Sequence, residues 1–165
     1  MVEESHELTP EIRHRLALLQ MRRELVSSVD AVIAIGGKLR TQSGWFPGVL
    51  EEVLRNLQAC HPVFLCRAFG GVSARLYDAL ILRDPTAFLA LEGHLNASLQ
   101  GLTPDVGVAN PYAIEALSWP ALLARIRLDQ EVLTNGDQLG GTSQTDPDAI
   151  AFEASRFLEG AFRSE

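Results

Sequence analysis

Two short apolar runs, each followed by a glycine pair and a helix-like segment, constrain the fold of this chain most strongly. The first run, Asp30 to Ile35, reads DAVIAI, and the second, Pro62 to Cys66, reads PVFLC. Neither run alternates polar and apolar residues, which is the pattern of a strand buried on both faces. Strands that alternate with helices along a chain form parallel sheets with right-handed crossovers. The sequence therefore predicts an α/β fold.

Capping and proline signals place helices around these strands. Thr9, Pro10 and Glu11 supply an N-cap, an N1 proline and a first-turn acid, so we expect a helix that runs to about Ser27. Further helices are expected at 47–59 and 72–82. Beyond residue 84 we expect helical pieces at 87–91, 95–99, 111–128 (broken by Pro120) and 148–162 (capped by Thr145), a short strand at 106–108, a turn at 135–136 and a loop at 140–143.

These elements predict a single domain over residues 1–165, with a core at about 9–83 and a helical C-terminal cover at about 84–165. We expect a Rossmann-like, three-layer architecture around a short parallel sheet. Only two strands are visible, whereas a doubly wound sheet has about five or six. The sheet is thus incomplete in the sequence: either the domain is shortened, or an N-terminal half is absent from this chain.

The charge balance narrows the classes of partner. The chain has 14 Lys and Arg residues against 21 Asp and Glu residues, a net charge of −7. An acidic protein is repelled by phosphate backbones, so no nucleic-acid partner is expected. No apolar run approaches the roughly 20 residues of a membrane helix, and the first thirty residues do not resemble a signal peptide. We therefore expect a cytoplasmic protein with no membrane partner.

Cysteine and histidine usage argues against a metal centre. Cys60 and Cys66 lack the C-x-x-C spacing, and the four histidines form no cluster with ligand spacing. A core of this size needs no disulfide, so two reduced thiols are expected. We predict no metal site and no other cofactor.

Two arginines lie in line with apolar residues of the first helix. Arg22 lines up with Leu18 and Leu25, and Arg23 lines up with Leu19, so both guanidinium groups are expected to face the core. A buried guanidinium without a partner would be very costly. Each arginine therefore pairs with a carboxylate at the edge of the domain or binds an anionic ligand, and the sequence leaves both interpretations open.

The two glycine pairs are candidate phosphate-binding turns. Gly36 and Gly37 end the first strand, and Gly70 and Gly71 precede a helix. The carboxyl ends of parallel strands and the N-termini of helices are places where α/β proteins bind anions. A tight turn explains each pair equally well.

Two glutamates stand in the first turn of the helix expected at 47–59. Its apolar stripe, formed by Leu50, Val53 and Leu54, includes neither Glu51 nor Glu52. Carboxylates in a first turn stabilise a helix by about 0.3–1 kcal/mol through the helix dipole. By composition alone, this role is favoured over catalysis.

Together these features resemble a known family. The run MRRELVSSVDAVIAIGGKLRTQSGWFPGVLEEVLRNL is similar to the core of the lonely-guy phosphoribohydrolases and of the wider SLOG superfamily of nucleotide-binding, Rossmann-like domains. That family carries a basic pair on a helix, an aspartate-led strand, a Gly-Gly turn and a Gly-Thr-x-x-Glu helix start. The similarity continues through PVFLCRAFGGVSARLYDAL, covers about residues 20 to 82, and corresponds to the C-terminal part of such a domain.

The resemblance implies roles for particular residues. Arg22 and Glu52 would occupy the positions of the family's catalytic arginine and glutamate. Gly36, Gly37 and Gly48 would lie against a nucleotide phosphate or ribose. The complete ligand-binding set that we expect is Arg22, Arg23, Gly36, Gly37, Lys38, Gly48, Glu52, Gly70 and Gly71.

Departures from the family pattern bear on activity. Val49 replaces the family threonine, the loop from Lys38 to Phe46 is lengthened, and the family's N-terminal phosphate loop has no counterpart in this sequence. A glycosidase must position base, ribose and phosphate together. The sequence therefore predicts a sensor or scaffold that binds a nucleotide or an NAD-derived ligand, without catalysis of its own.

Two alternatives stay open. One is a nucleoside 5'-monophosphate phosphoribohydrolase that cleaves the N-glycosidic bond with Arg22 and Glu52. The other is an interaction or oligomerisation module, in which an incomplete sheet leaves an edge that can pair with a second copy. A homodimer or larger homo-oligomer is expected under each reading.

Overall fold

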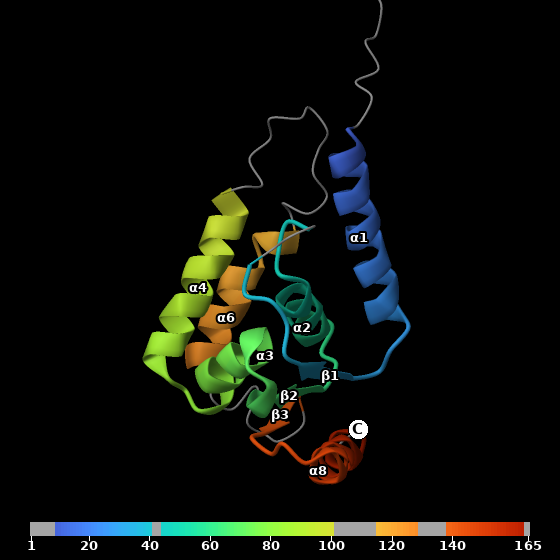
Figure 1. Ribbon diagram of the computed structural model, residues 1–165, viewed down its shortest axis with the longest axis vertical. Coiled ribbons are helices and arrows are strands. Elements are labelled where there is room, and N and C mark those ends of the chain that lie inside the picture. Colours follow the sequence, from blue (N-terminus) through green and yellow to red (C-terminus); the bar gives the residue numbers. More distant parts are fainter. Residues whose placement is uncertain (1–8, 41–43, 101–114, 129–137, 164–165) are drawn as a thin grey trace, which may run out of the picture.

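A computed structural model describes residues 9–40, 44–100, 115–128 and 138–163 (Figure 1). Helices lie on both faces of a small parallel sheet, which confirms the predicted Rossmann-like α/β class. The elements in chain order are α1 (Pro10–Ser27), β1 (Val32–Ile35), α2 (Gly48–Gln58), β2 (Val63–Cys66), the 3₁₀ turn η1 (Arg67–Phe69), α3 (Gly71–Leu76), the π-helical turn η2 (Tyr77–Ile81), α4 (Pro85–Gln100), α6 (Trp119–Leu128), β3 (Leu139–Thr142) and α8 (Pro147–Ala161).

The described sheet has three strands in the order β1-β2-β3, all parallel. Val63 of β2 is in register with Val32 of β1 on one side and with Leu139 of β3 on the other. Every residue of the central strand β2 is buried, as its unbroken apolar run predicts.

The third strand corrects the expectation of a loop at 140–143. β3 carries two glycines, which normally disfavour a strand. Here each glycine is needed, because a side chain at Gly140 would overlap the ring of Phe157 and a side chain at Gly141 would collide with the carbonyl of Leu65. The segment after residue 84 is therefore more than a helical cover, since it also completes the sheet.

The prediction that the first strand is buried on both faces is wrong. Ile33 and Ile35 are 45% and 52% exposed, because β1 is an edge strand of the described sheet. On that face α8 packs on β2 and β3, where Phe64 lies against Ile150 and Ala154. Figure 1 shows α8 below β2 and β3, and the outer face of β1 has no such cover from the described elements.

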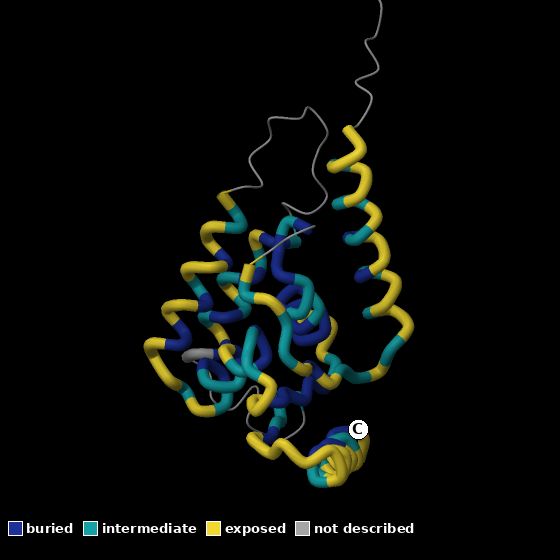
Figure 2. The backbone as a smooth tube through the Cα atoms, in the orientation of Figure 1, coloured by how far each residue is buried: buried dark blue, intermediate teal, exposed yellow. Residues whose placement is uncertain are grey.

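The main core lies on the opposite face, where α2 and α3 pack on the strands. Leu54 of α2 is fully buried there, and Trp119 of α6 packs edge-on against Phe46 with their ring centroids 4.8 Å apart. Helix α1 lies beside α2, and only Leu19 and Arg22 of α1 are buried. Figure 2 shows the rest of α1 at intermediate or exposed positions.

Several boundaries differ from the sequence predictions. The two pieces expected at 87–91 and 95–99 form one continuous helix, α4. The cap of α8 is Asp146, whose side chain accepts a hydrogen bond from the N–H of Asp148, whereas Thr145 was expected. Thr9 caps α1 as predicted, and Pro120 lies in the first turn of α6, where a helix tolerates proline. The strand expected at 106–108 and the turn expected at 135–136 lie outside the described residues.

No helix among the described elements has the length and apolar character needed to cross a membrane. Both cysteines are free thiols; Cys60 is exposed and Cys66 is buried, and burial raises the pKa of the Cys66 thiol.

The glycine turns at the ends of β1 and β2 lock together. The N–H of Val72 donates to the carbonyl of Gly37 and the N–H of Ser73 donates to the carbonyl of Gly36, at 3.0 and 2.8 Å. In return, the N–H of Gly36 donates to the hydroxyl of Ser73. Gly71 has a φ of +65°, and a side chain there would collide with the carbonyl of Gly37. These close backbone contacts hold Gly36 and Gly37 against the start of α3. They thereby fix the carboxyl end of β1, where the loop to α2 begins.

Two glycine substitutions test this lock. Gly71→Ala is expected to destabilise the protein by roughly 2 kcal/mol or more, because a Cβ is disfavoured at positive φ and meets backbone here. Gly93→Ala is the matched control; it lies inside α4 with no atom within 4 Å of the added Cβ, so a gain of about 0.5–1 kcal/mol is expected. Urea unfolding measures the free energy of unfolding of both variants. Equal values for Gly71→Ala and Gly93→Ala would contradict the close backbone contact at Gly71.

Candidate functional site

The centre of the candidate site is an arginine of α1 that lies between two carboxylates of α2. Arg22 Nη1 donates to Glu51 Oε2 at 2.8 Å, and Arg22 Nε lies 3.5 Å from Glu52 Oε1. Glu51 is fully buried, whereas the Glu52 side chain keeps 29% of its surface exposed. The structure thus brings together the two residues that the resemblance pairs as catalytic, and adds Glu51, which the apolar stripe gave no reason to bury.

Three further residues extend this pair into a chain of alternating charges. Arg55 Nε donates to Glu51 Oε1 at 2.9 Å, and Arg55 Nη1 donates to Glu115 Oε2 at 2.6 Å. Arg23 Nη2 donates to the other oxygen of Glu115, also at 2.6 Å. The Arg55 guanidinium also lies 5.6 Å from the ring centre of Trp119, which favours a cation. We call the set Arg22, Arg23, Glu51, Glu52, Arg55 and Glu115 the ion network.

The ion network is balanced, with three guanidinium groups facing three carboxylates. Burial of an unpaired charge costs several kcal/mol, and the ion pairs of the network offset part of this cost. Burial alone would raise the pKa of Glu115, but hydrogen bonds from Arg23 and Arg55 outweigh this effect and lower the pKa below its ordinary value. Arg22 and Arg23 therefore both have carboxylate partners, as one of the two sequence interpretations predicts.

Gly48 has its role in this arrangement too. A Cβ at Gly48 would lie 2.8 Å from Arg22 Nη2, so the absence of a side chain lets the guanidinium reach the first turn of α2. A cation at a helix N-terminus is opposed by the helix dipole. Glu51 in that turn and Glu52 directly after it offset the repulsion, so the glycine, the arginine and the two carboxylates form one local unit.

The other expected ligand-binding residues lie on the sheet side of the same helix start. Gly37 contacts Val49 in the first turn of α2, since a Cβ added at Gly37 would lie 2.7 Å from Val49 Cγ2. Gly36 and Gly37 face Gly70 and Gly71 through the backbone contacts described above. Lys38 is exposed at the beginning of the loop to α2. Arg22, Gly48 and Glu52 thus meet at the start of α2, with the glycine turns nearby, whereas Arg23 lies apart from them, beside Glu115 and the C-terminal end of α2.

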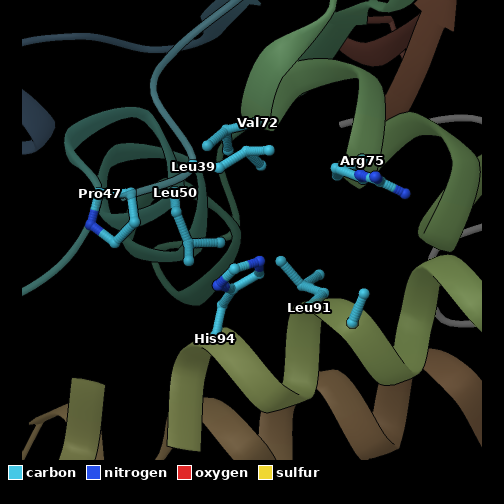
Figure 3. A pocket seen from close by; sticks show the side chains of 8 residues that line it. Leu39, Pro47, Leu50, Val72, Arg75, Leu91 and His94 are labelled. Carbon is cyan, nitrogen blue, oxygen red and sulfur yellow. The ribbon is translucent and has the colours of Figure 1, made fainter. Parts of the chain in front are cut away.

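Two adjoining cavities open over this helix start. The narrower one is mostly apolar and lies between Leu50 of α2, Val72 of α3 and Leu91 of α4. Figure 3 shows Arg75 and the His94 ring on different sides of it. The larger cavity has a volume of about 340 Å³ and shares Leu39, Pro47 and His94 with the first. Its remaining lining residues are Arg15, Arg40, Gly44, Trp45, Ala97 and Ser98.

Sequence reasoning missed the lining of the larger cavity and half of the ion network. Arg15, Trp45 and His94 come from segments far apart in the chain, and no spacing pattern joins them. For Arg55 a signal existed, because Glu51 and Arg55 stand four residues apart on one helix, a spacing typical of ion pairs. Among the described residues no group of three or more His, Cys, Asp or Glu side chains could hold a metal ion.

Comparison with protein families gives one match: the family described as SLOG cluster2 matches residues 2–109. The chain belongs to this SLOG family. The match includes α1 through α4 and every residue of the expected ligand-binding set. It falls on the N-terminal part of the chain, which corrects the expectation that the similarity begins near residue 20 and represents the C-terminal part of a SLOG domain. No curated protein and no solved structure gives a significant match to the chain.

The ion network predicts unequal roles for the neighbouring glutamates of α2. Glu51→Gln is expected to destabilise the protein by about 3 kcal/mol, because two buried arginines lose their charged acceptor. Glu52→Gln is the matched control and should cost less than about 1 kcal/mol, since this carboxylate is partly exposed and makes a long contact. Denaturant unfolding at neutral pH measures both, and similar losses would show that burial of Glu51 is not decisive.

The lowered pKa of Glu115 predicts a dependence of stability on pH. A carboxyl whose pKa is lower in the folded protein stabilises the fold above its unfolded pKa of 4.5, and this contribution is lost as the pH falls through the lower, folded pKa. We expect Glu115→Gln to remove that contribution. The stability difference between wild type and variant should be constant above about pH 6 and shrink below pH 4.5. A difference that persists unchanged in acid would rule out the ion pairs as its source.

Proposed function

We propose that this SLOG domain binds a nucleotide or an NAD-derived ligand and acts as a sensor or scaffold. The observation that carries the proposal is the cavity of about 340 Å³ that opens beside Pro47, the N-cap of α2, and reaches residues of α1 and α4. Its volume lies within the range of small-molecule sites, about 300–1,000 Å³. The helix start follows the carboxyl end of a parallel strand, which is where open α/β sheets bind ligands.

The state of Arg22 supports binding without catalysis. Its guanidinium already contacts two carboxylates and is packed against Gly48. To hold a substrate phosphate or a departing base, Arg22 would have to leave the fully buried Glu51, and an uncompensated buried charge is strongly unfavourable. Arg22 and Glu51 are thus suited to hold α1 on α2.

The phosphoribohydrolase is the second candidate, and one contact favours it. Arg22 and Glu52, which the resemblance assigns as catalytic, meet at 3.5 Å although they lie on different helices. In this alternative Glu52 would act at the ribose C1′ while Arg22 orients its carboxylate. Release of free adenine from AMP, lost in Glu52→Gln by about 10²–10⁴-fold, would establish it.

We also propose that the chain forms a homodimer or larger homo-oligomer. The edge strand β1 supports this, because Ile33 and Ile35 are exposed and α8 does not cover them. Light scattering tests the proposal, and a monomer near 18.0 kDa at high concentration would contradict it.

A nucleotide panel tests the proposed function. At a ligand concentration about 100 times Kd, binding adds about 2.7 kcal/mol, which raises the Tm of a protein of this size by roughly 5–10 °C. We expect such a rise with at least one of AMP, ADP, ADP-ribose and NAD, with no release of free base above the rate without protein. No Tm rise and no heat of binding with any of them at millimolar concentration would refute nucleotide binding. Base release by the wild type would instead favour the hydrolase.

A further inference from the structure

The larger cavity is basic although the protein is acidic. Its lining includes Arg15, Arg40 and His94, and no Asp or Glu of the described part of the chain lines it. The chain as a whole has a net charge of −7. A local excess of cations in an acidic protein attracts anions to that place. The lining therefore points to an anionic ligand.

The arginines of this cavity differ from those of the ion network. Among the described residues Arg15 pairs with Glu11, one helical turn away, and the Glu11 side chain is 73% exposed, so water weakens the pair. Arg15 Nε is buried and, like Arg23 Nε, has no hydrogen-bond partner among the described residues, so the exposure of Glu11 is what distinguishes Arg15. Arg40 is exposed in the segment that joins β1 to α2. Both guanidinium groups can thus take up an anion at little cost in lost pairing.

Another cavity, of about 310 Å³, provides the contrast. It is lined by Arg23, Arg55 and Glu115 of the ion network, together with Val26, Gln58 and Ala59. Its two arginines already share one carboxylate at 2.6 Å each. An anion entering there would compete with Glu115 and meet its repulsion, so this cavity is the weaker anion site.

An aromatic ring completes the larger cavity. Trp45 lines it and is partly exposed, unlike the fully buried Trp119. Stacking of a nucleobase on an aromatic side chain contributes about 1–3 kcal/mol. The narrow apolar cavity of Figure 3 adjoins the larger cavity, and the two share the lining residues Leu39, Pro47 and His94. The lining therefore combines groups for phosphates with a surface for a planar, less polar ring.

We propose that the larger cavity binds a nucleoside diphosphate, with Arg15 and Arg40 on the phosphates and Trp45 against the base. Each guanidinium fork matches the oxygens of one phosphate group, which is why two arginines suit a diphosphate better than a single charged group. His94 adds a third donor at the junction of the two cavities. This assignment rests on the proposed function and specifies its ligand and residues.

Calorimetric titration of the full chain with ADP, AMP and adenosine tests the assignment. Arg15→Gln and Arg40→Gln should each weaken ADP binding about tenfold, and the double variant about a hundredfold, with little change for adenosine. Arg163→Gln is the matched control, because it removes the same charge from an exposed residue just after α8 and should leave ADP binding unchanged. ADP should also quench tryptophan fluorescence, and Trp45→Phe should abolish the quenching.

The outcomes separate the two proposals. Failure of the wild type to bind ADP, AMP or adenosine would overturn the proposed function and this assignment with it. ADP binding that Arg15→Gln and Arg40→Gln leave unchanged, in variants whose melting is normal, would overturn the assignment alone. Equal affinity for ADP and adenosine would likewise reject the arginines as phosphate ligands. Binding of pyrophosphate as tight as that of ADP would reject the base contact at Trp45.

Discussion

The arrangement of this domain depends on one buried carboxylate. Glu51 is fully buried and accepts hydrogen bonds from Arg22 of α1 and from Arg55, one turn further along α2. Helix α1 has few apolar contacts with the core, since Leu19 is its one buried apolar residue and Leu16 is only partly buried, so its ion pairs carry much of the attachment. Hydrophobic contact is non-directional, whereas a pair of charged hydrogen bonds fixes both position and rotation. Through Arg55 the same carboxylate connects to Glu115 and hence to the segment that precedes α6.

The ion network and the larger cavity are connected through α1. Arg15 and Arg22 stand seven residues apart, two helical turns, and therefore lie on similar faces of the helix. The ion pair between Arg22 and Glu51 fixes the position of α1, and in that position Arg15 lines the larger cavity. Arg22, which the resemblance places at the family's catalytic arginine, thus has a structural role here. In the site that we propose, it would position Arg15 beside a ligand that Arg22 itself does not touch.

Local patterns carried the sequence predictions that the structure confirms. Thr9 at the cap of α1 and the apolar run of β2 each follow from a few neighbouring residues. For Arg22 the cost of burying a charge required a partner but left open whether this is a carboxylate or a ligand, and the structure shows a carboxylate. What could not be predicted depends on distant segments. β3 pairs two glycines with β2 because Phe157 and Leu65 leave no room for side chains, and no local propensity reports such crowding.

In the candidate site, too, some residues could be predicted from a local motif, whereas others come together from distant segments of the chain. The neighbourhood of Arg22, Gly48 and Glu52 follows from a motif confined to two adjacent helices. Glu115 joins the ion network from far along the chain, and Arg15, Trp45 and His94 meet in a cavity without any common spacing. The exposure of Ile33 and Ile35 could likewise not be predicted from the sequence, because an apolar strand has the same residue pattern at the centre and at the edge of a sheet.

The position of β3 in the chain has a consequence for the order of folding. β2 is the central strand, yet one of its two neighbours, β3, begins at Leu139, long after β2 has left the ribosome. Until then Phe64 and Cys66 lack both β3 beside them and α8 beneath them. Closing so long a loop carries an entropic cost that precedes any gain from strand pairing. The segment that matches the family therefore holds the lining of the larger cavity, but it cannot shield its own central strand. The described sheet is complete only once β3, in the last sixth of the chain, has been synthesised.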